Sequence, residues 1–170
     1  MQKLLLLMIV FFLASCSFQM RGELPLAPPL HHLYLQTPDP YGQLARNLRQ
    51  FLKMSNVRLA DNPQSATTIL TIISEEPTQQ LLSISPTQQT RQYNLILTVA
   101  FEISGNKGVV LVPRQTVSET RTLPIESSQI LAGSNEANML YQQMRLAIVY
   151  DIMSRLASDE VNHLLTEKNN

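Results

Sequence analysis

The 170-residue sequence has one cysteine, five glycines and no tryptophan, and these shortages exclude several kinds of site. A single cysteine cannot form an internal disulfide or a cysteine-based metal site. The few glycines make no phosphate-binding loop, and the sequence has no Gly-x-Ser-x-Gly motif of a serine hydrolase. Cysteine chemistry is therefore restricted to one side chain acting alone.

Charged residues are also scarce, at 15% of the chain against about 25% in typical soluble domains. The 13 Lys and Arg residues are balanced by 13 Asp and Glu residues. Nucleic-acid binding normally needs an excess of positive charge, so we expect no nucleic-acid partner. Gln, Ser, Thr and Asn take the place of the missing charges, which predicts a polar but weakly charged surface.

The side chains that could carry catalysis are few and scattered. His31 and His32 are adjacent, and adjacent side chains of an extended chain point to opposite sides, so the pair is a poor chelate. His163 stands alone near the C-terminus. We interpret Glu75 and Glu76 as a solvated turn at the end of a strand. The sequence therefore predicts no enzyme, no metal site and no cofactor.

The N-terminus has the pattern of a bacterial lipoprotein signal. Lys3 precedes an unbroken apolar run at 4–14, which spans only about 16 Å as a helix and is too short to cross a bilayer. Residues 13–16 read Leu-Ala-Ser-Cys, which matches the lipobox at every position. We predict cleavage before Cys16, with an S-diacylglycerol and an N-acyl group on that residue. The alternative is an ordinary secretory signal with a cysteine nearby.

Three acyl chains on Cys16 are enough for stable anchoring without a membrane-spanning helix. Ser17 stands where an Asp would indicate retention in the inner membrane, so the pattern favours the outer membrane, on its periplasmic side. We expect a signal peptide at 1–15, a lipid anchor and extended tether at 16–30, a single domain at 31–166 and a tail at 167–170.

Hydrophobic patterning predicts four strands. The clearest is 92–103, where Tyr, Leu, Leu, Val, Phe and Ile alternate with mostly polar residues. A Gly-Asn-Lys-Gly turn at 105–108 leads to the next strand, which has a mostly polar outer half. The predicted strands are 33–35, 67–75, 92–103 and 109–123.

Two segments have helical spacing of their apolar residues. The first helix should have Asp39 as N-cap and Pro40 as its first residue, and should end near 55–56. The second should begin with Ser134 as N-cap and, because no Gly or Pro interrupts it, continue for almost 50 Å by the rise of an α-helix. It would leave a frayed or partner-seeking end, with Val161, Leu164 and Leu165.

The order β-α-β-β-β-α predicts an α+β fold with two helices on one face of a four-stranded mixed sheet. The first two strands should be parallel, joined by a right-handed crossover through the first helix. The other face of the sheet should remain polar.

Several segments resemble the LPS-assembly lipoproteins of the LptE family. Residues 16–22 (Cys-Ser-Phe-Gln-Met-Arg-Gly) are similar to that family's Cys-Gly-Phe-x-Leu-Arg-Gly, from which Ser17 and Met20 depart. Residues 39–48 match its Asp-Pro-Tyr-Gly-x-Leu-x-Arg-x-Leu pattern. Shorter similarities occur at 56–59, 82–83, 91–95, 99–101, 144–145 and 155–156.

The resemblance implies a protein partner and a ligand. LptE-like proteins occupy the lumen of the outer-membrane β-barrel LptD, help it fold and bind lipopolysaccharide. A plug rich in Gln, Ser, Thr and Asn suits a polar barrel lumen, because it can hydrogen-bond to the wall without burying unpaired ions.

Lipopolysaccharide presents phosphates beside acyl chains, and it needs cationic donors near an apolar surface. Arg91 stands at the base of the polar 83–90 loop, and we expect Lys107 and Arg114 to flank this loop from the facing hairpin. Arg121 lies farther along the last strand. These four residues are the candidate lipopolysaccharide contacts.

Two other functions stay open. A free outer-membrane lipoprotein that binds a soluble periplasmic ligand or peptidoglycan would be a stable monomer with an apolar pocket. An envelope hydrolase would need a convergent acid and base, for which the adjacent histidines and glutamates named above are the only candidates.

Overall fold

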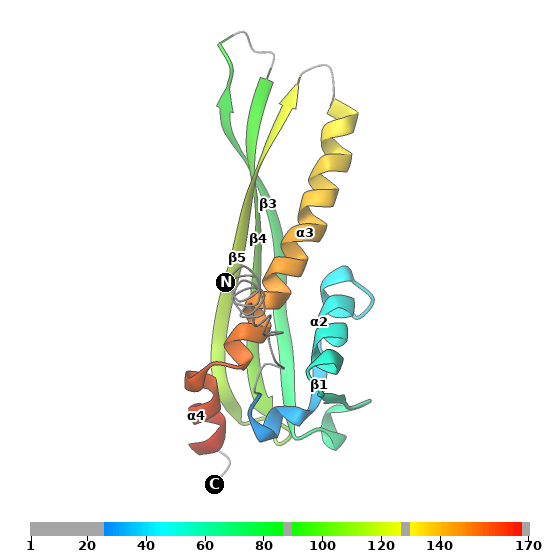
Figure 1. The fold of residues 1–170 in the computed structure, drawn as a ribbon, viewed down its shortest axis with the longest axis vertical. Coiled ribbons are helices and arrows are strands. Elements are labelled where there is room, and N and C mark those ends of the chain that lie inside the picture. Colours follow the sequence, from blue (N-terminus) through cyan, green and yellow to red (C-terminus); the bar gives the residue numbers. More distant parts are fainter. Residues whose placement is uncertain (1–25, 87–89, 127–129, 168–170) are drawn as a thin grey trace, which may run out of the picture.

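The computed structural model describes residues 26–86, 90–126 and 130–167, which form a five-stranded mixed sheet with helices packed against it (Figure 1). The fold is α+β, as the sequence predicts, with one more strand and one more α-helix than expected. The strands are β1 (His32–Gln36), β2 (Arg58–Leu59), β3 (Thr68–Ile84), β4 (Thr90–Gly105) and β5 (Val110–Glu126). The helices are η1 (Pro28–His31), α2 (Gln43–Met54), η2 (Pro63–Ser65), α3 (Ile130–Leu156) and α4 (Asp159–Glu167).

The strands lie in the order β2-β1-β3-β4-β5. Strand β1 is parallel to both β2 and β3, which confirms that the strands before and after α2 are parallel, and β4 is antiparallel to both of its neighbours. The prediction of four strands is wrong because β2 has only two residues, too few for a hydrophobic period to appear. It is held at the edge by pairing with β1 and by the hydrogen bond from Ala60 N to Leu33 O, at 2.9 Å.

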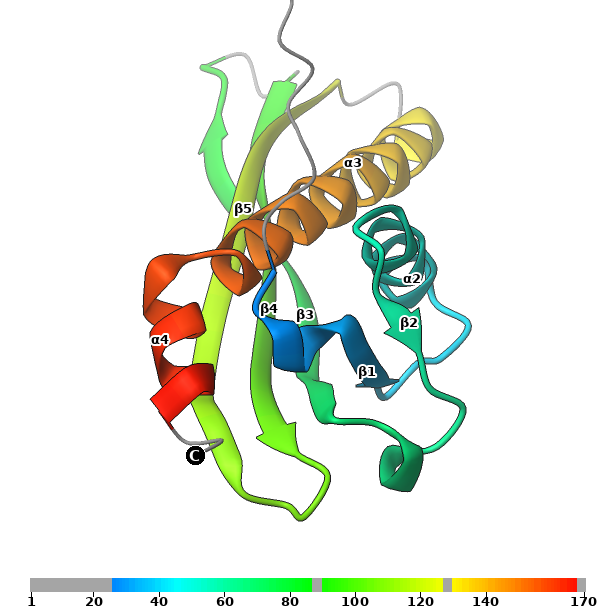
Figure 2. The ribbon, with the colours of Figure 1, turned by 60° about the horizontal axis from the view of Figure 1, so that its bottom comes forward.

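The predicted alternation of β4 forms the centre of the core. Helices α2 and α3 lie over one face of the sheet, and α4 packs against β5 (Figure 2). The other face is polar, as expected: Thr98 and Ser118 hydroxyls lie 3.2 Å apart across β4 and β5, and Thr122 donates to Asn94 at 3.2 Å. The β4 residues buried under the helices are Leu95, Leu97, Val99, Phe101 and Ile103.

Helix α2 begins three residues later than predicted. The Asp39 carboxylate accepts the N–H of Tyr41, 3.2 Å away, and so closes a turn before the helix; Gly42 takes the N-cap position. The C-terminal prediction is confirmed, since Ser55 is the C-cap and Asn56 has the left-handed φ of 59° that follows many helices.

The C-terminal helix is two helices, so the prediction of a single one is wrong. Ser158 Oγ accepts the N–H of Val161 at 3.3 Å and donates to Arg155 O at 2.7 Å, which ends α3 and caps α4. The expected free end is wrong too, because Val161 and Leu165 are buried in the core. Helix α3 also starts before Ser134, at Ile130.

Strand β3 continues far beyond its predicted end. It passes through Glu75 and Pro77 to Ile84, so the interpretation of Glu75 and Glu76 as a turn is wrong. Pro77 is tolerated because β1 pairs with β3 only as far as Thr71, which leaves the rest of β3 at the edge of the described sheet. All five strands are therefore present at one end of the sheet, whereas only β3, β4 and β5 continue to the other end.

Residues 1–25, with the predicted signal peptide and Cys16, lie outside the described part of the chain. The packed core begins within the stretch predicted as tether, since Leu26, Ala27 and Leu30 are buried. Among the described residues, no helix is long and apolar enough to cross a membrane.

Candidate functional site

The structure separates the predicted ligand-binding cations. Arg91 is the second residue of β4, whereas Lys107 lies in the turn after β4. Sixteen residues of extended chain separate the ends of β4 by about 50 Å. Arg114 lies near the start of β5, toward the Lys107 end. The expectation that Lys107 and Arg114 flank the 83–90 loop is therefore wrong.

The β4–β5 turn itself forms as predicted. Gly105 N–H donates to Val109 O at 2.8 Å, and Gly108 adopts a φ of 80°, which glycine reaches without strain. We call this the basal end of the sheet. The distal end is the other end, formed by residues 81–84 of β3 and 90–93 of β4.

Arg121 lies between the two ends. It stands opposite Leu95 in the β4–β5 register, so it is four residues, or about 13 Å, from the position of Arg91 along the strand. Its guanidinium pairs with Glu119 at 2.9 Å, which neutralises part of its charge. Arg91 is therefore the cation best placed to serve the distal end.

The distal end carries three aliphatic side chains that are about half exposed. Leu81, Leu82 and Ile84 are 52%, 55% and 49% exposed. A register shift between Leu81 and Ser83 leaves Leu82 as an extra residue in the strand, so the aliphatic side chains are not confined to one face. Sequence reasoning missed this cluster because it ended the strand before these residues, although three aliphatics in four positions were a visible signal.

Arg91 stands among these aliphatic residues. The register places it opposite Ile84 on β3 and Ile125 on β5, so all three share one face of the sheet. Arg91 has no carboxylate within ion-pair distance among the described residues. A cation beside exposed aliphatics can bind a molecule that has both a phosphate and hydrocarbon chains.

Helix α3 is fixed to the outer part of β3 by polar contacts. Arg145 Nε donates to Glu75 Oε1 at 2.6 Å, and Tyr141 OH donates to Thr78 O at 2.9 Å. Burial raises the pKa of the Tyr141 phenol above 10.0, while the nearby Arg145 charge acts in the opposite direction. These contacts hold the helix against the edge strand that leads to the distal end.

The remaining titratable residues do not converge. His31 is exposed, and His163 Nδ1 lies 3.4 Å from Glu167 on the same helix turn. Within the described ranges, no three His, Cys, Asp or Glu residues lie close enough to hold a metal ion.

Comparison with known proteins gives the family. The model of the family LptE, lipopolysaccharide-assembly, matches residues 30–156. The LPS-assembly lipoprotein LptE of Yersinia enterocolitica is 33% identical over 159 residues, which cover 90% of this chain and 73% of the relative.

Solved structures share the fold. The rare lipoprotein B of Shewanella oneidensis aligns with a TM-score of 0.66 and 28% identity, over 76% of this chain and 96% of the other. A minor lipoprotein of Acinetobacter baumannii aligns with a TM-score of 0.67 and 19% identity, over 80% and 96%. The family model that matches most of the domain and the relative at 33% identity establish that the chain belongs to the LptE family of non-enzymatic lipopolysaccharide-assembly lipoproteins.

Proposed function

We propose that the protein is an outer-membrane lipoprotein that forms a complex with an LptD-like β-barrel, as its lumenal plug and folding partner, and binds lipopolysaccharide at the distal end. The single observation that carries the ligand assignment is the place of Arg91 among the exposed side chains of Leu81, Leu82 and Ile84, with no carboxylate of the described residues within ion-pair distance. Family membership supports a role in lipopolysaccharide assembly.

The lipid anchor is supported by the sequence around Cys16. The Leu-Ala-Ser-Cys motif follows an apolar run of the length of a signal peptide, and Cys16 is the one cysteine of the chain. Acylation there anchors the protein to the inner leaflet of the outer membrane, on the periplasmic side.

The barrel partner is supported by the face of the sheet opposite the helices. On β5 this face presents the exposed residues Thr116, Ser118, Thr120 and Thr122, all of them uncharged and able to hydrogen-bond. The interior wall of a large outer-membrane barrel is polar, so such a face can exchange hydrogen bonds with it without burying unpaired charge.

Binding of purified lipopolysaccharide tests the ligand assignment. Arg91→Ala should weaken binding roughly tenfold or more, because hydrogen bonds to charged groups contribute about 1.5–3 kcal/mol each. Lys107→Ala is the matched control, since it removes one cation from the basal end and should leave binding unchanged. Equal losses in both variants would show that binding is a nonspecific effect of charge and would overturn the assignment.

Co-purification tests the partner. The acylated protein, extracted from outer membranes in a mild detergent, should bring a large β-barrel protein with it in stoichiometric amount. Recovery of a monomer with full lipopolysaccharide-assembly function would contradict the proposal and favour the free periplasm-facing lipoprotein.

A further inference from the structure

Positive charge is concentrated around α2. Residues 40–60 contain Arg46, Arg49, Lys53 and Arg58, and every carboxylate of the chain lies outside this stretch. The whole chain has equal numbers of acidic and basic residues, so the excess of positive charge is confined to this stretch. A local excess of positive charge attracts a negatively charged partner.

The three α2 cations lie on one side of the helix, because spacings of three and four residues repeat the helical turn. Arg46 donates to Tyr41 O and, at 2.7 Å, to Gln43 Oε1, while Arg49 donates to Pro40 O at 2.6 Å. The loop before the helix thus holds both guanidinium groups in place. Among the described residues, no carboxylate lies within ion-pair distance of either arginine or of Lys53.

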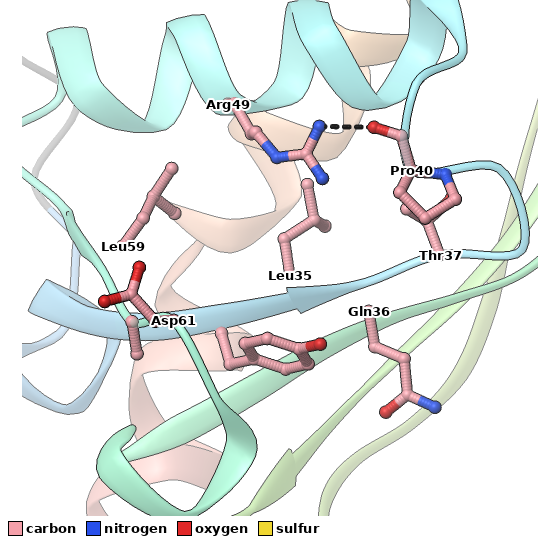
Figure 3. Close-up of a pocket in the computed structure, with 9 residues that line it drawn as sticks. Leu35, Gln36, Thr37, Pro40, Arg49, Leu59 and Asp61 are labelled. Carbon is pink, nitrogen blue, oxygen red and sulfur yellow. Dashed lines mark hydrogen bonds between the residues drawn. The ribbon is translucent and has the colours of Figure 1, made fainter.

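A cavity of about 310 Å³ adjoins Arg49, one of these three cations (Figure 3). Its lining is mixed: Leu35, Leu59 and Ala60 are apolar, Gln36 and Thr37 are polar, and Arg49 from α2 and Asp61 from the segment after β2 are charged. The volume is at the lower limit for ligand pockets and is large enough for one side chain of a partner.

We propose that the stripe formed by Arg46, Arg49 and Lys53, together with this cavity, is a docking surface for an acidic segment of a partner protein. Carboxylates of the partner pair with the cations of the stripe, and an uncharged side chain of the partner enters the cavity. Tyr41 and Met54 are 84% and 64% exposed at the two ends of α2, and Tyr, Met and Arg are enriched in protein interfaces.

A protein fits this surface better than a phosphate group does. Asp61 lines the cavity together with Arg49, so any anion is disfavoured inside the cavity. A partner segment can place an uncharged side chain there, donate an N–H to Asp61 and keep its carboxylates outside the cavity, beside Arg46 and Lys53, whereas a small phosphate has no such uncharged part. The surface is also separate from the distal end, since α2 packs against α3 and β2 at the broad part of the sheet (Figure 1). The inference rests on the proposed function only in taking the chain to be held by a partner protein.

Site-specific photo-crosslinking of the full acylated chain in cells tests the inference. A benzophenone amino acid at Gln50, exposed on the cationic side of α2, should form an adduct with a segment of the partner rich in Asp and Glu, identified by mass spectrometry. The double change Arg46→Glu with Lys53→Glu should reduce the adduct at least tenfold. The double change Lys107→Glu with Arg114→Glu, an equal charge reversal at two exposed positions of the β4–β5 hairpin, should leave it unchanged.

A second variant tests the cavity without changing the charge of the surface. Ala60→Phe fills the cavity and should also reduce the Gln50 adduct, while thermal melting shows whether each variant is folded. Adducts with lipid alone, an undiminished adduct in the Arg46 and Lys53 double variant, or no adduct at all would overturn the inference. Loss of the barrel from the wild-type purification would instead overturn the proposed function, and an acidic protein adduct at Gln50 would then still support this surface.

Discussion

Single residues decide where the helices of this protein end. Ser158 separates α3 from α4 by bonding to both, with its Oγ donating to Arg155 O and accepting from Val161 N–H. Asn56 ends α2 by adopting a positive φ, which Asn tolerates better than most residues. Side chains of a few atoms thus set the direction of whole elements.

Replacing Ser158 by alanine should lower the free energy of unfolding by about 1 kcal/mol, the usual loss for an N-cap serine. The loss arises because the N–H of Val161 loses its side-chain acceptor while the start of α4 stays packed on the core. Urea unfolding monitored by circular dichroism measures the change. Ser154→Ala, at an exposed position within α3, is the control and should be nearly neutral.

At the scale of elements, the Arg145–Glu75 ion pair and the Tyr141 hydrogen bond connect α3 to the edge strand β3. The Arg145 and Glu75 side chains are 23% and 25% exposed, so water screens the pair only in part. A double-mutant cycle of Arg145→Met and Glu75→Gln should give a coupling free energy of about 1 kcal/mol, above the median for surface pairs. Additive effects of the two changes would show that this pair does not stabilise the packing of α3 on β3.

The Tyr141 phenol should make this contact sensitive to alkaline pH. Its pKa is raised in the folded state, chiefly by burial, so the folded protein retains the proton more strongly than the unfolded chain. The protonated Tyr141 phenol therefore contributes fully to the free energy of unfolding below pH 10. This contribution is lost as the pH rises from 10.0 through the folded-state pKa.

Unfolding of the wild type and of Tyr141→Phe should be compared in urea at pH 8 to 11. The wild type should lose more stability above pH 10 than the variant does, because phenylalanine has no proton to lose. Parallel pH profiles would contradict a role for the Tyr141 hydroxyl.

Elements with a long, regular period could be predicted, and elements set by single contacts could not. The alternation from Tyr93 to Ile103 gave the central strand because each second side chain enters one core. Pro77 misled the prediction of β3, since proline ends most strands but is tolerated at an edge. The break at Ser158 was missed because it needs no glycine or proline.

The candidate site was predictable only in part for the same reason. Arg91 could be placed near the loop between the second and third predicted strands from the order of the elements alone. The separation of Lys107 from that loop depends on the length of β4, and the exposure of Leu82 depends on a register shift in β3. Neither feature has a periodic signal in the sequence.

At the scale of the whole molecule, packing decreases from the basal end to the distal end. Leu70 of β3 lies between β1 and β4 and is fully buried, whereas residues 76–83 of the same strand are exposed. The basal end of the sheet is therefore well packed, whereas the β3 side of the distal end has few buried contacts. Such a distal end should open at lower free energy than the basal end, which suits the bulky ligand that we propose for it.

Amide hydrogen exchange along β3 measures this gradient directly. The amides of 69–72 should exchange only through global unfolding, while those of 78–83 should exchange by local opening at a lower free energy. Arg145→Met should increase exchange in 73–80 without changing 69–72, because Arg145 ties α3 to Glu75 in the outer part of the strand. Uniform protection along the strand would show that β3 unfolds as one unit, and the distal end would then have to bind its ligand as a rigid surface.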